Sequence, residues 1–122
     1  MDQKILIIDA HPVYIHKTES FLAGLTFKNI VLATSGKKGI ERIKSENPDL
    51  VILSGMLPDT ESHDVCKMIK ATNRLTKIIV QTGLLTDELS ITRFRECGAD
   101  LVLPRKEKDL APLQKAISQL LK

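Results

Sequence analysis

The chain has 122 residues, the usual size of one domain and long enough to bury a core without disulfide or metal staples. Aromatic residues make up only 3% of it and Trp is absent, which argues against a surface that stacks nucleic-acid bases. The formal net charge is +3, but Lys and Arg are scattered among Asp and Glu, as on a solvated surface of mixed charge. We therefore do not expect nucleic acid as a partner.

The sequence predicts no membrane span, because it contains no run of about 18 apolar residues. Its N-terminus also lacks the long apolar region and the small-residue cleavage site of a signal peptide. The spacing of Cys66 and Cys97 matches no metal or redox motif, and we expect both to be reduced, partly buried thiols. These features indicate a cytoplasmic protein.

Short apolar runs alternate along the chain with longer stretches of helical periodicity. A repeated order of strand and helix predicts a parallel sheet with helices on both faces. The near-continuous apolar character of the runs agrees, since parallel strands are covered on both sides. The predicted strands are residues 4–8, 29–33, 50–53, 77–81 and 100–103, and the predicted helices are residues 12–25, 36–46, 62–71, 87–97 and 110–121.

Capping residues indicate where several of these helices begin or end. Pro12 suits the first turn of the first helix, and Ser35 is a suitable N-cap for the second, which Pro48 prevents from continuing. Thr86 and Asp109 are the expected N-caps of the fourth and fifth helices. We expect residues 1–122 to form a single domain without an attached output domain.

The carboxyl ends of the predicted strands are the expected location of a functional site, because ligands bind there in open parallel sheets. The loops at this edge hold Asp9, Ala10, Ser54, Thr82 and Arg105. A Gly-rich phosphate loop does not follow the first strand, which argues against dinucleotide and Walker-type sites. A flavin site is also poorly supported, because the first loop is acidic rather than rich in hydroxyl groups and glycine.

Several short motifs follow one another in a fixed order along the chain. They are Ile-Ile-Asp-Ala-His-Pro at residues 7–12, Pro-Asp-Leu-Val-Ile-Leu at 48–53 before Ser54, Met-Leu-Pro-Asp at 56–59, Ile-Ile-Val-Gln-Thr-Gly at 78–83 and Gly-Ala-Asp-Leu-Val-Leu-Pro-Arg at 98–105. In this order and at this spacing the whole chain resembles the response-regulator receiver domain. The resemblance implies a CheY-like, flavodoxin-like α/β fold, a doubly wound (βα)5 sandwich with a five-stranded parallel sheet.

The resemblance also implies a site, from which this chain departs. In receiver domains a cluster of acids holds Mg²⁺, one of them accepts the phosphoryl group, and a hydroxyl and a lysine contact it. Asp9 matches one acid, but Ala10 stands at the position of its neighbour and Ser54 at the acceptor position. Thr82 matches the hydroxyl, and Arg105 replaces the lysine. Three expected carboxylates are thus reduced to one.

Two consequences follow for chemistry. Mg²⁺ needs near-octahedral oxygen ligands, so we expect its binding to be lost and no other cofactor to replace it. A serine hydroxyl without a base is also a poor nucleophile, and phosphoryl transfer lacks its positioning and charge neutralisation. We interpret the chain as a pseudo-receiver in bacterial signal transduction, not an enzyme, which acts by binding another signalling protein independently of phosphorylation.

The candidate partner contacts are Leu84, Leu85, Phe94 and Val102. Leu84 and Leu85 follow the fourth strand, where they either anchor a partner or cover the vacated acid pocket. Phe94 replaces a small residue of the family, which predicts altered packing of the fourth helix, and Val102 replaces the aromatic residue whose rotamer reports phosphorylation. The family's usual partner surface, formed by the fourth helix, fifth strand and fifth helix, is also where we expect a homodimer to form.

Two alternative functions remain open at this point. The chain could be an unconventional phosphorelay member that competes for a histidine kinase. Alternatively, Asp9, His11 and Ser54 could form the triad of a small serine hydrolase, although Ser54 does not lie in a Gly-x-Ser-x-Gly elbow. We expect His16 and His63 to be solvated, and they have no credible zinc spacing.

Arg105 carries the most specific structural expectation. Asp9 is the one carboxylate expected in the pocket, and a guanidinium offers up to five donors in a planar fork. We expect Arg105 to reach Asp9, with the hydroxyl of Ser54 or Thr82 supplying neighbouring hydrogen bonds. The alternatives are that Arg105 extends into water, or that His11 is the partner of Asp9.

Overall fold

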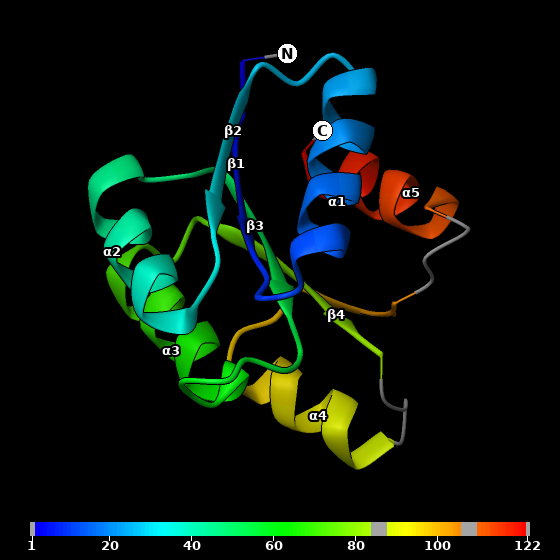
Figure 1. Cartoon of the computed structure of the whole chain (residues 1–122). Coiled ribbons are helices and arrows are strands. Elements are labelled where there is room, and N and C mark those ends of the chain that lie inside the picture. The colour runs from blue at the N-terminus through cyan, green and yellow to red at the C-terminus, as the bar shows by residue number, and fades with distance from the viewer. Residues whose placement is uncertain (1, 84–87, 106–109, 122) are drawn as a thin grey trace.

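The computed structural model describes residues 2–83, 88–105 and 110–121 as a parallel sheet of five strands in the order β2-β1-β3-β4-β5, covered by helices. Figure 1 shows helices α1 and α5 on one face of the sheet and α2, α3 and α4 on the other. Along the chain the elements are β1 (Lys4–Ile8), α1 (Pro12–Gly24), β2 (Asn29–Ala33), α2 (Gly36–Glu46), β3 (Leu50–Ser54), α3 (Ser62–Thr72), β4 (Lys77–Thr82), α4 (Glu88–Glu96), β5 (Leu101–Pro104) and α5 (Ala111–Leu120).

The two faces of the sheet bury separate cores because side chains alternate along each strand. In β1, Ile5 and Ile7 pack on the face covered by α1 and α5, together with Ile15 of α1. Leu6 and Ile8 pack on the other face against α2, α3 and α4. The aliphatic strands predicted from composition therefore fill both sides of the central sheet.

The parallel register brings the carboxyl ends of the strands to one side of the sheet, called the strand-end edge below, which is distinct from the edge strands β2 and β5. Ile8 of β1 lies opposite Leu53 of β3, and Thr82 of β4 lies opposite Pro104 of β5. Asp9, Ser54, Thr82 and Arg105 consequently share this edge, although they are far apart in the sequence. The topology thus assembles the predicted site before any side-chain contact is considered.

The predicted elements agree with the observed ones to within one or two residues at most ends. Ser35 caps α2 as expected, its Oγ accepting a hydrogen bond from the Lys38 amide at 3.1 Å. Asn47 then ends α2 in the left-handed region, with φ 47°. The predicted caps Thr86 and Asp109 lie outside the described residues. In the part of the chain that is described, no helix has the length and apolar character needed to cross a membrane.

Candidate functional site

Asp9 follows β1 directly and is almost completely buried, with 5% of its surface exposed. Its amide is bound to the Ala33 carbonyl of β2 at 3.0 Å, which fixes the backbone from which the carboxylate projects. Oδ1 accepts a hydrogen bond from the His11 amide at 2.9 Å, and Oδ2 forms an ion pair with Nη2 of Arg105. Both carboxylate oxygens are therefore engaged within the protein.

Arg105 leaves the end of β5 and crosses the strand ends to reach Asp9, as expected from the sequence. Its amide donates to the Thr82 carbonyl at 2.9 Å, which ties the β5 end to β4. The guanidinium carbon lies 3.8 Å from the centre of the Tyr14 ring, a cation–π geometry. With 18% of its side chain exposed, Arg105 is held in the pocket rather than extended into water.

Ser54 lies at the end of β3 with 4% of its surface exposed. Its Oγ donates to the Met56 carbonyl at 3.0 Å and accepts from the Met56 amide at 3.3 Å. Ser62 Oγ donates in turn to the Ser54 carbonyl at 2.8 Å. The hydroxyl thus closes a local turn of the β3–α3 loop. The expectation that it would support the Asp9–Arg105 pair is wrong for Ser54, because its hydrogen bonds go to its own loop.

His11 is the N-cap of α1. Its Nδ1 accepts a hydrogen bond from the Tyr14 amide at 3.1 Å, which satisfies one of the free amides of the first helical turn. The alternative that His11 is the partner of Asp9 holds only for the His11 backbone amide, which binds Oδ1, whereas Arg105 binds Oδ2. No hydrogen bond links the described His11 ring to Ser54, so this geometry gives no support to a serine hydrolase.

A second acid near this edge, Asp59, points to α2 instead of the pocket. Its two carboxylate oxygens accept hydrogen bonds from the amides of Gly36 and Lys37, each at 2.9 Å. These hydrogen bonds lower the pKa of Asp59 below its ordinary value of 3.8. This contact was not predicted from the sequence. The sequence feature that could have indicated it is Gly36, because a side chain at this position would collide with the loop that holds Asp59. A Cβ there would lie 2.2 Å from Cγ2 of Thr60 and 3.4 Å from Asp59 Oδ1.

The donor set at the strand ends does not fit Mg²⁺. Such a site takes one or two carboxylates together with water and phosphate oxygens. Asp9 already gives one oxygen to an amide and the other to a cation, and Asp59 is bound to α2. No group of three or more His, Cys, Asp or Glu side chains suited to a metal occurs among the described residues.

A hollow of about 440 Å³ lies over the pocket. Besides Asp9, His11 and Arg105, its walls are Ala10, Pro12, Met56 and Pro58. Met56 is 66% exposed at the rim. The hollow therefore presents mainly apolar groups to the outside. At its base the opposite charges of Asp9 and Arg105 neutralise each other.

Phe94 of α4 is buried, with 4% of its surface exposed, and stacks on His63 of α3 with ring centres 3.9 Å apart. That α4 packs differently from the family's usual arrangement stays a prediction, but Phe94 itself is too buried to be a direct partner contact. The prediction that His63 is solvated is wrong. Both ring nitrogens are buried without a hydrogen-bond partner in the described structure, and burial lowers the pKa of His63 below its ordinary value of 6.5.

Of the remaining candidate contacts, only Val102 lies among the described residues. Val102 of β5 is partly buried, lies opposite Val80 of β4 and packs against the core shared with α4. Leu89 of α4 is 73% exposed and was not identified from the sequence. The predicted contacts Leu84 and Leu85 lie outside the described residues.

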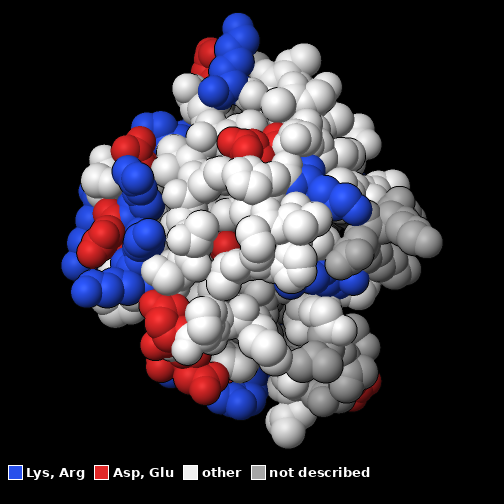
Figure 2. All heavy atoms as spheres, in the orientation of Figure 1, with Lys and Arg blue, Asp and Glu red and all other residues white. Residues whose placement is uncertain are grey.

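Both signs of charge occur on the face of the molecule seen in Figure 2, where a group of acidic side chains lies below the basic ones. Figure 2 shows a group of basic side chains on the left, in the region of α2, with acidic side chains among them. The sequence of α2 has the same mixture, with Lys37, Lys38, Arg42 and Lys44 beside Glu41 and Glu46. This face gives no extended basic stripe of the kind that binds nucleic acid.

Comparison with known proteins gives one family over most of the chain. A family model described as the response regulator receiver domain matches residues 5–118. The DNA-binding response regulator MtrA of Mycolicibacterium smegmatis is 31% identical over 112 residues, which are 90% of this chain and 48% of MtrA. The transcriptional regulatory protein PhoP of Bacillus subtilis is 26% identical over 82% of this chain and 41% of its own length. The chain thus spans about half the length of these curated relatives.

Solved structures agree with the observed architecture. The signal receiver domain of a DNA-binding response regulator from Colwellia psychrerythraea superposes with a TM-score of 0.86 at 27% identity, covering 98% of each chain. A BeF3-activated DrrB receiver domain gives a TM-score of 0.87 at 28% identity, covering 99% of this chain and 98% of that one. The predicted CheY-like α/β fold is confirmed.

Proposed function

This chain belongs to the response regulator receiver family of two-component signalling, and on that premise we propose that it is a pseudo-receiver, which binds a partner protein without being phosphorylated. The observation that carries the proposal is the pair formed by Asp9 and Arg105. It uses Asp9, the one carboxylate that remains at the strand ends in the described part of the chain. We place its work in the cytoplasm, with no enzymatic activity of its own.

Loss of the acceptor supports this function. Ser54 stands at the acceptor position, and its hydroxyl is bound to the backbone of its own loop. No described base contacts that hydroxyl, and a serine without a base is a poor nucleophile. Phosphorylation of Ser54 by a dedicated kinase is also disfavoured, because the residue is only 4% exposed.

Loss of the metal also supports it. The guanidinium of Arg105 brings a fixed positive charge to Asp9, where a receiver would place Mg²⁺. A metal ion would have to displace that cation and bind through a single carboxylate, which is too few protein ligands for useful affinity. We therefore propose that Mg²⁺ binding is lost and that no cofactor takes its place.

We place the partner on the surface formed by α4, β5 and α5. Leu89 of α4 is 73% exposed, and β5 is an edge strand in which Leu101, Val102 and Leu103 are only partly buried. Exposed apolar side chains beside an unpaired strand edge are suited to protein contact. The partner is another signalling protein, and a second copy of this chain is one form that it could take.

Two measurements test the loss of phosphorylation. Incubation with acetyl phosphate and Mg²⁺ should leave the intact mass unchanged. A beryllofluoride–Mg²⁺ mixture, which mimics the acyl phosphate, should cause no saturable NMR shifts at the amides of Asp9, Ser54 and Thr82. The DrrB receiver domain, which is described as BeF3-activated, is a suitable positive control. Added phosphoryl mass or saturable shifts at those amides would contradict the proposal.

Restoring the missing residues gives a sharper version of the same test. Ser54→Asp alone should not be labelled by acetyl phosphate, because Ala10 still provides no second carboxylate and Arg105 still holds Asp9. The triple variant Ser54→Asp, Ala10→Asp and Arg105→Lys should regain part of the labelling, since the sheet that positions these residues is intact. Full labelling of the single variant would show that the metal site matters less than we propose.

The second candidate is an unconventional phosphorelay member that binds a histidine kinase at the strand-end edge. It is favoured by Met56, which lines the hollow over Asp9 and is 66% exposed, and by Val13, which follows the lining residue Pro12 in the sequence and is 62% exposed. A pull-down from the native host, repeated with Val13→Asp and with Leu89→Asp, separates the two surfaces. Loss of the partner in Leu89→Asp alone supports the main proposal, whereas loss in Val13→Asp alone supports the kinase-binding alternative.

A further inference from the structure

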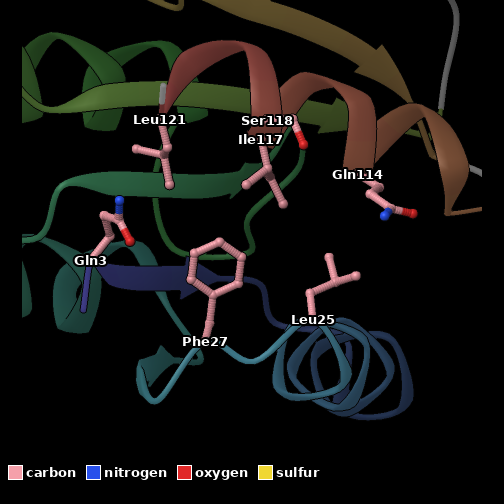
Figure 3. Close-up of a pocket in the computed structure, with 7 residues that line it drawn as sticks. All are labelled: Gln3, Leu25, Phe27, Gln114, Ile117, Ser118 and Leu121. Atoms are coloured by element: carbon pink, nitrogen blue, oxygen red, sulfur yellow. The ribbon is translucent and has the colours of Figure 1, made fainter. Parts of the chain in front are cut away.

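A second hollow lies at the opposite edge of the sheet from Asp9 and Arg105. It has a volume of about 380 Å³ and is formed by residues beside the start of β1, the loop after α1 and one side of α5. Figure 3 shows Leu25 and Phe27 facing Ile117 and Leu121 across this space, with Gln3 at its side. Its volume is at the small end of the range for ligand pockets, about 300–1,000 Å³.

The walls of this hollow are apolar and include an aromatic ring. Phe27 and Ile117 are buried, with 5% and 2% of their surfaces exposed, so the floor of the hollow belongs to the core between α1 and α5. Leu25 and Leu121 pack against the same core from the sides. A flat apolar molecule placed here would contact a surface that is already formed.

The polar groups of the hollow select the kind of ligand. Its described polar residues are Gln3, Gln114 and Ser118, none of which carries a charge, so a neutral molecule fits better than an ion. Gln3 Oε1 is buried and has no hydrogen-bond partner among the described residues. A buried acceptor without a donor is costly, and a turn of the amide toward the hollow would let a ligand N–H or O–H satisfy it.

We propose that this hollow binds a small neutral aromatic molecule that carries one N–H or O–H donor. Leu25, Phe27, Ile117 and Leu121 hold its ring, and Gln3 accepts its hydrogen bond. The site is separate from the strand-end pocket, and it does not depend on whether the protein is phosphorylated.

Indole is the test ligand, because it combines a flat apolar ring system with a single N–H donor. Titration of the ¹⁵N-labelled full chain should give saturable shifts centred on Gln3, Phe27 and Ile117. Indene has the same ring shape without the N–H, and should bind about 2- to 12-fold more weakly, which corresponds to the net value of one hydrogen bond. In Gln3→Met, which keeps about the length of the side chain but not the acceptor, the preference for indole over indene should disappear.

A matched pair of variants tests the location. Ser118 lines the hollow on the exposed side of α5, so Ser118→Phe should fill the space and abolish the saturable shifts. Gln119→Phe places the same ring on an exposed neighbouring position that does not line the hollow, and should leave binding unchanged. The dispersion of the amide spectrum reports whether each variant is folded.

Several results would overturn the proposal. These are the absence of saturable shifts up to the solubility of indole, shifts centred on Asp9 and Arg105, indene binding as tightly as indole to the wild type, and unchanged binding in Ser118→Phe. Light scattering that shows a dimer, lost in Ser118→Phe but kept in Gln119→Phe, would assign the hollow to a second copy of the chain instead.

Discussion

The coupling free energy between Asp9 and Arg105 is the quantity on which the fixed pocket depends. Nη2 of Arg105 forms a charge-assisted hydrogen bond with Oδ2 of Asp9, and their side chains are 18% and 7% exposed. A hydrogen bond to a charged group contributes about 1.5–3 kcal/mol, and breaking a fully buried ion pair costs about 3–5 kcal/mol. Because the His11 amide still satisfies Oδ1 when Arg105 is removed, we expect the lower range of about 1.5–3 kcal/mol.

A double-mutant cycle measures this coupling directly. The variants are Asp9→Asn, Arg105→Met and the two combined, each unfolded in urea and followed by circular dichroism. Arg105→Met should be the more destabilising single change, because it leaves a buried carboxylate without its cation. It also removes the cation–π contact with Tyr14, which is why the cycle and not the single variant gives the pair energy.

A second ion pair in the same protein provides the control. Lys4 and Glu46 are 3.1 Å apart, but their side chains are 35% and 30% exposed. The cycle of Lys4→Met and Glu46→Gln should give a coupling of only about 0–1 kcal/mol, as for exposed pairs. A coupling between Asp9 and Arg105 below about 0.5 kcal/mol, or no larger than that of the control, would refute the reasoning.

Three further predictions concern stability. Burial lowers the pKa of His63 in the folded protein below its ordinary value of 6.5. As the pH falls below 6.5, His63 therefore takes up a proton more readily in the unfolded chain, and the free energy of unfolding should decrease. Urea unfolding at about pH 7 and pH 5 should show this loss in wild type and in the exposed-site control His16→Gln, but less of it in His63→Leu; an equal loss in His63→Leu would contradict the assignment. Gly55→Ala should destabilise by about 1–3 kcal/mol, because its Cβ would lie 2.8 Å from Thr82 Cβ. A Gly55→Ala variant as stable as wild type would show that the β3–α3 loop moves to make room for the added methyl group. Gly24→Ala is the control, because its Cβ would meet no atom within 4 Å. It should stabilise α1 by about 0.5–1 kcal/mol.

The fold was predictable because each strand is a short apolar run followed by a stretch of helical period. Ser35 and Pro48 bound α2 through local backbone chemistry, which a sequence shows directly. The Asp9–Arg105 pair was predictable for a different reason. Asp9 follows β1 and Arg105 follows β5, at the same end of the sheet with β3 and β4 between them, so only a long cationic side chain can cross the strand ends and reach the acid.

The contacts that were missed depend on the relative placement of elements. His63 lies between polar residues in the sequence, so nothing local indicates that its ring is buried. The large Phe94 on α4 was recognised, but which α3 side chain it meets depends on how the two helices pack. Ser54 is the opposite case, because its hydroxyl binds the backbone of Met56, only two residues away. A hydrogen bond to the Asp9–Arg105 pair would have satisfied the hydroxyl equally well, so the sequence did not distinguish the two partners.

The free energy of the Asp9–Arg105 pair also limits how far this pocket can act as a switch. A switch needs a second arrangement that is populated or that a ligand can favour by its differential affinity. If opening the pocket costs the expected pair energy of about 1.5–3 kcal/mol, the open form makes up only about 0.6–7% of molecules. A partner that needs the open pocket must supply that free energy, whereas a partner bound to α4, β5 and α5 need not. The pair therefore favours recognition of a fixed surface over recognition of a changed state.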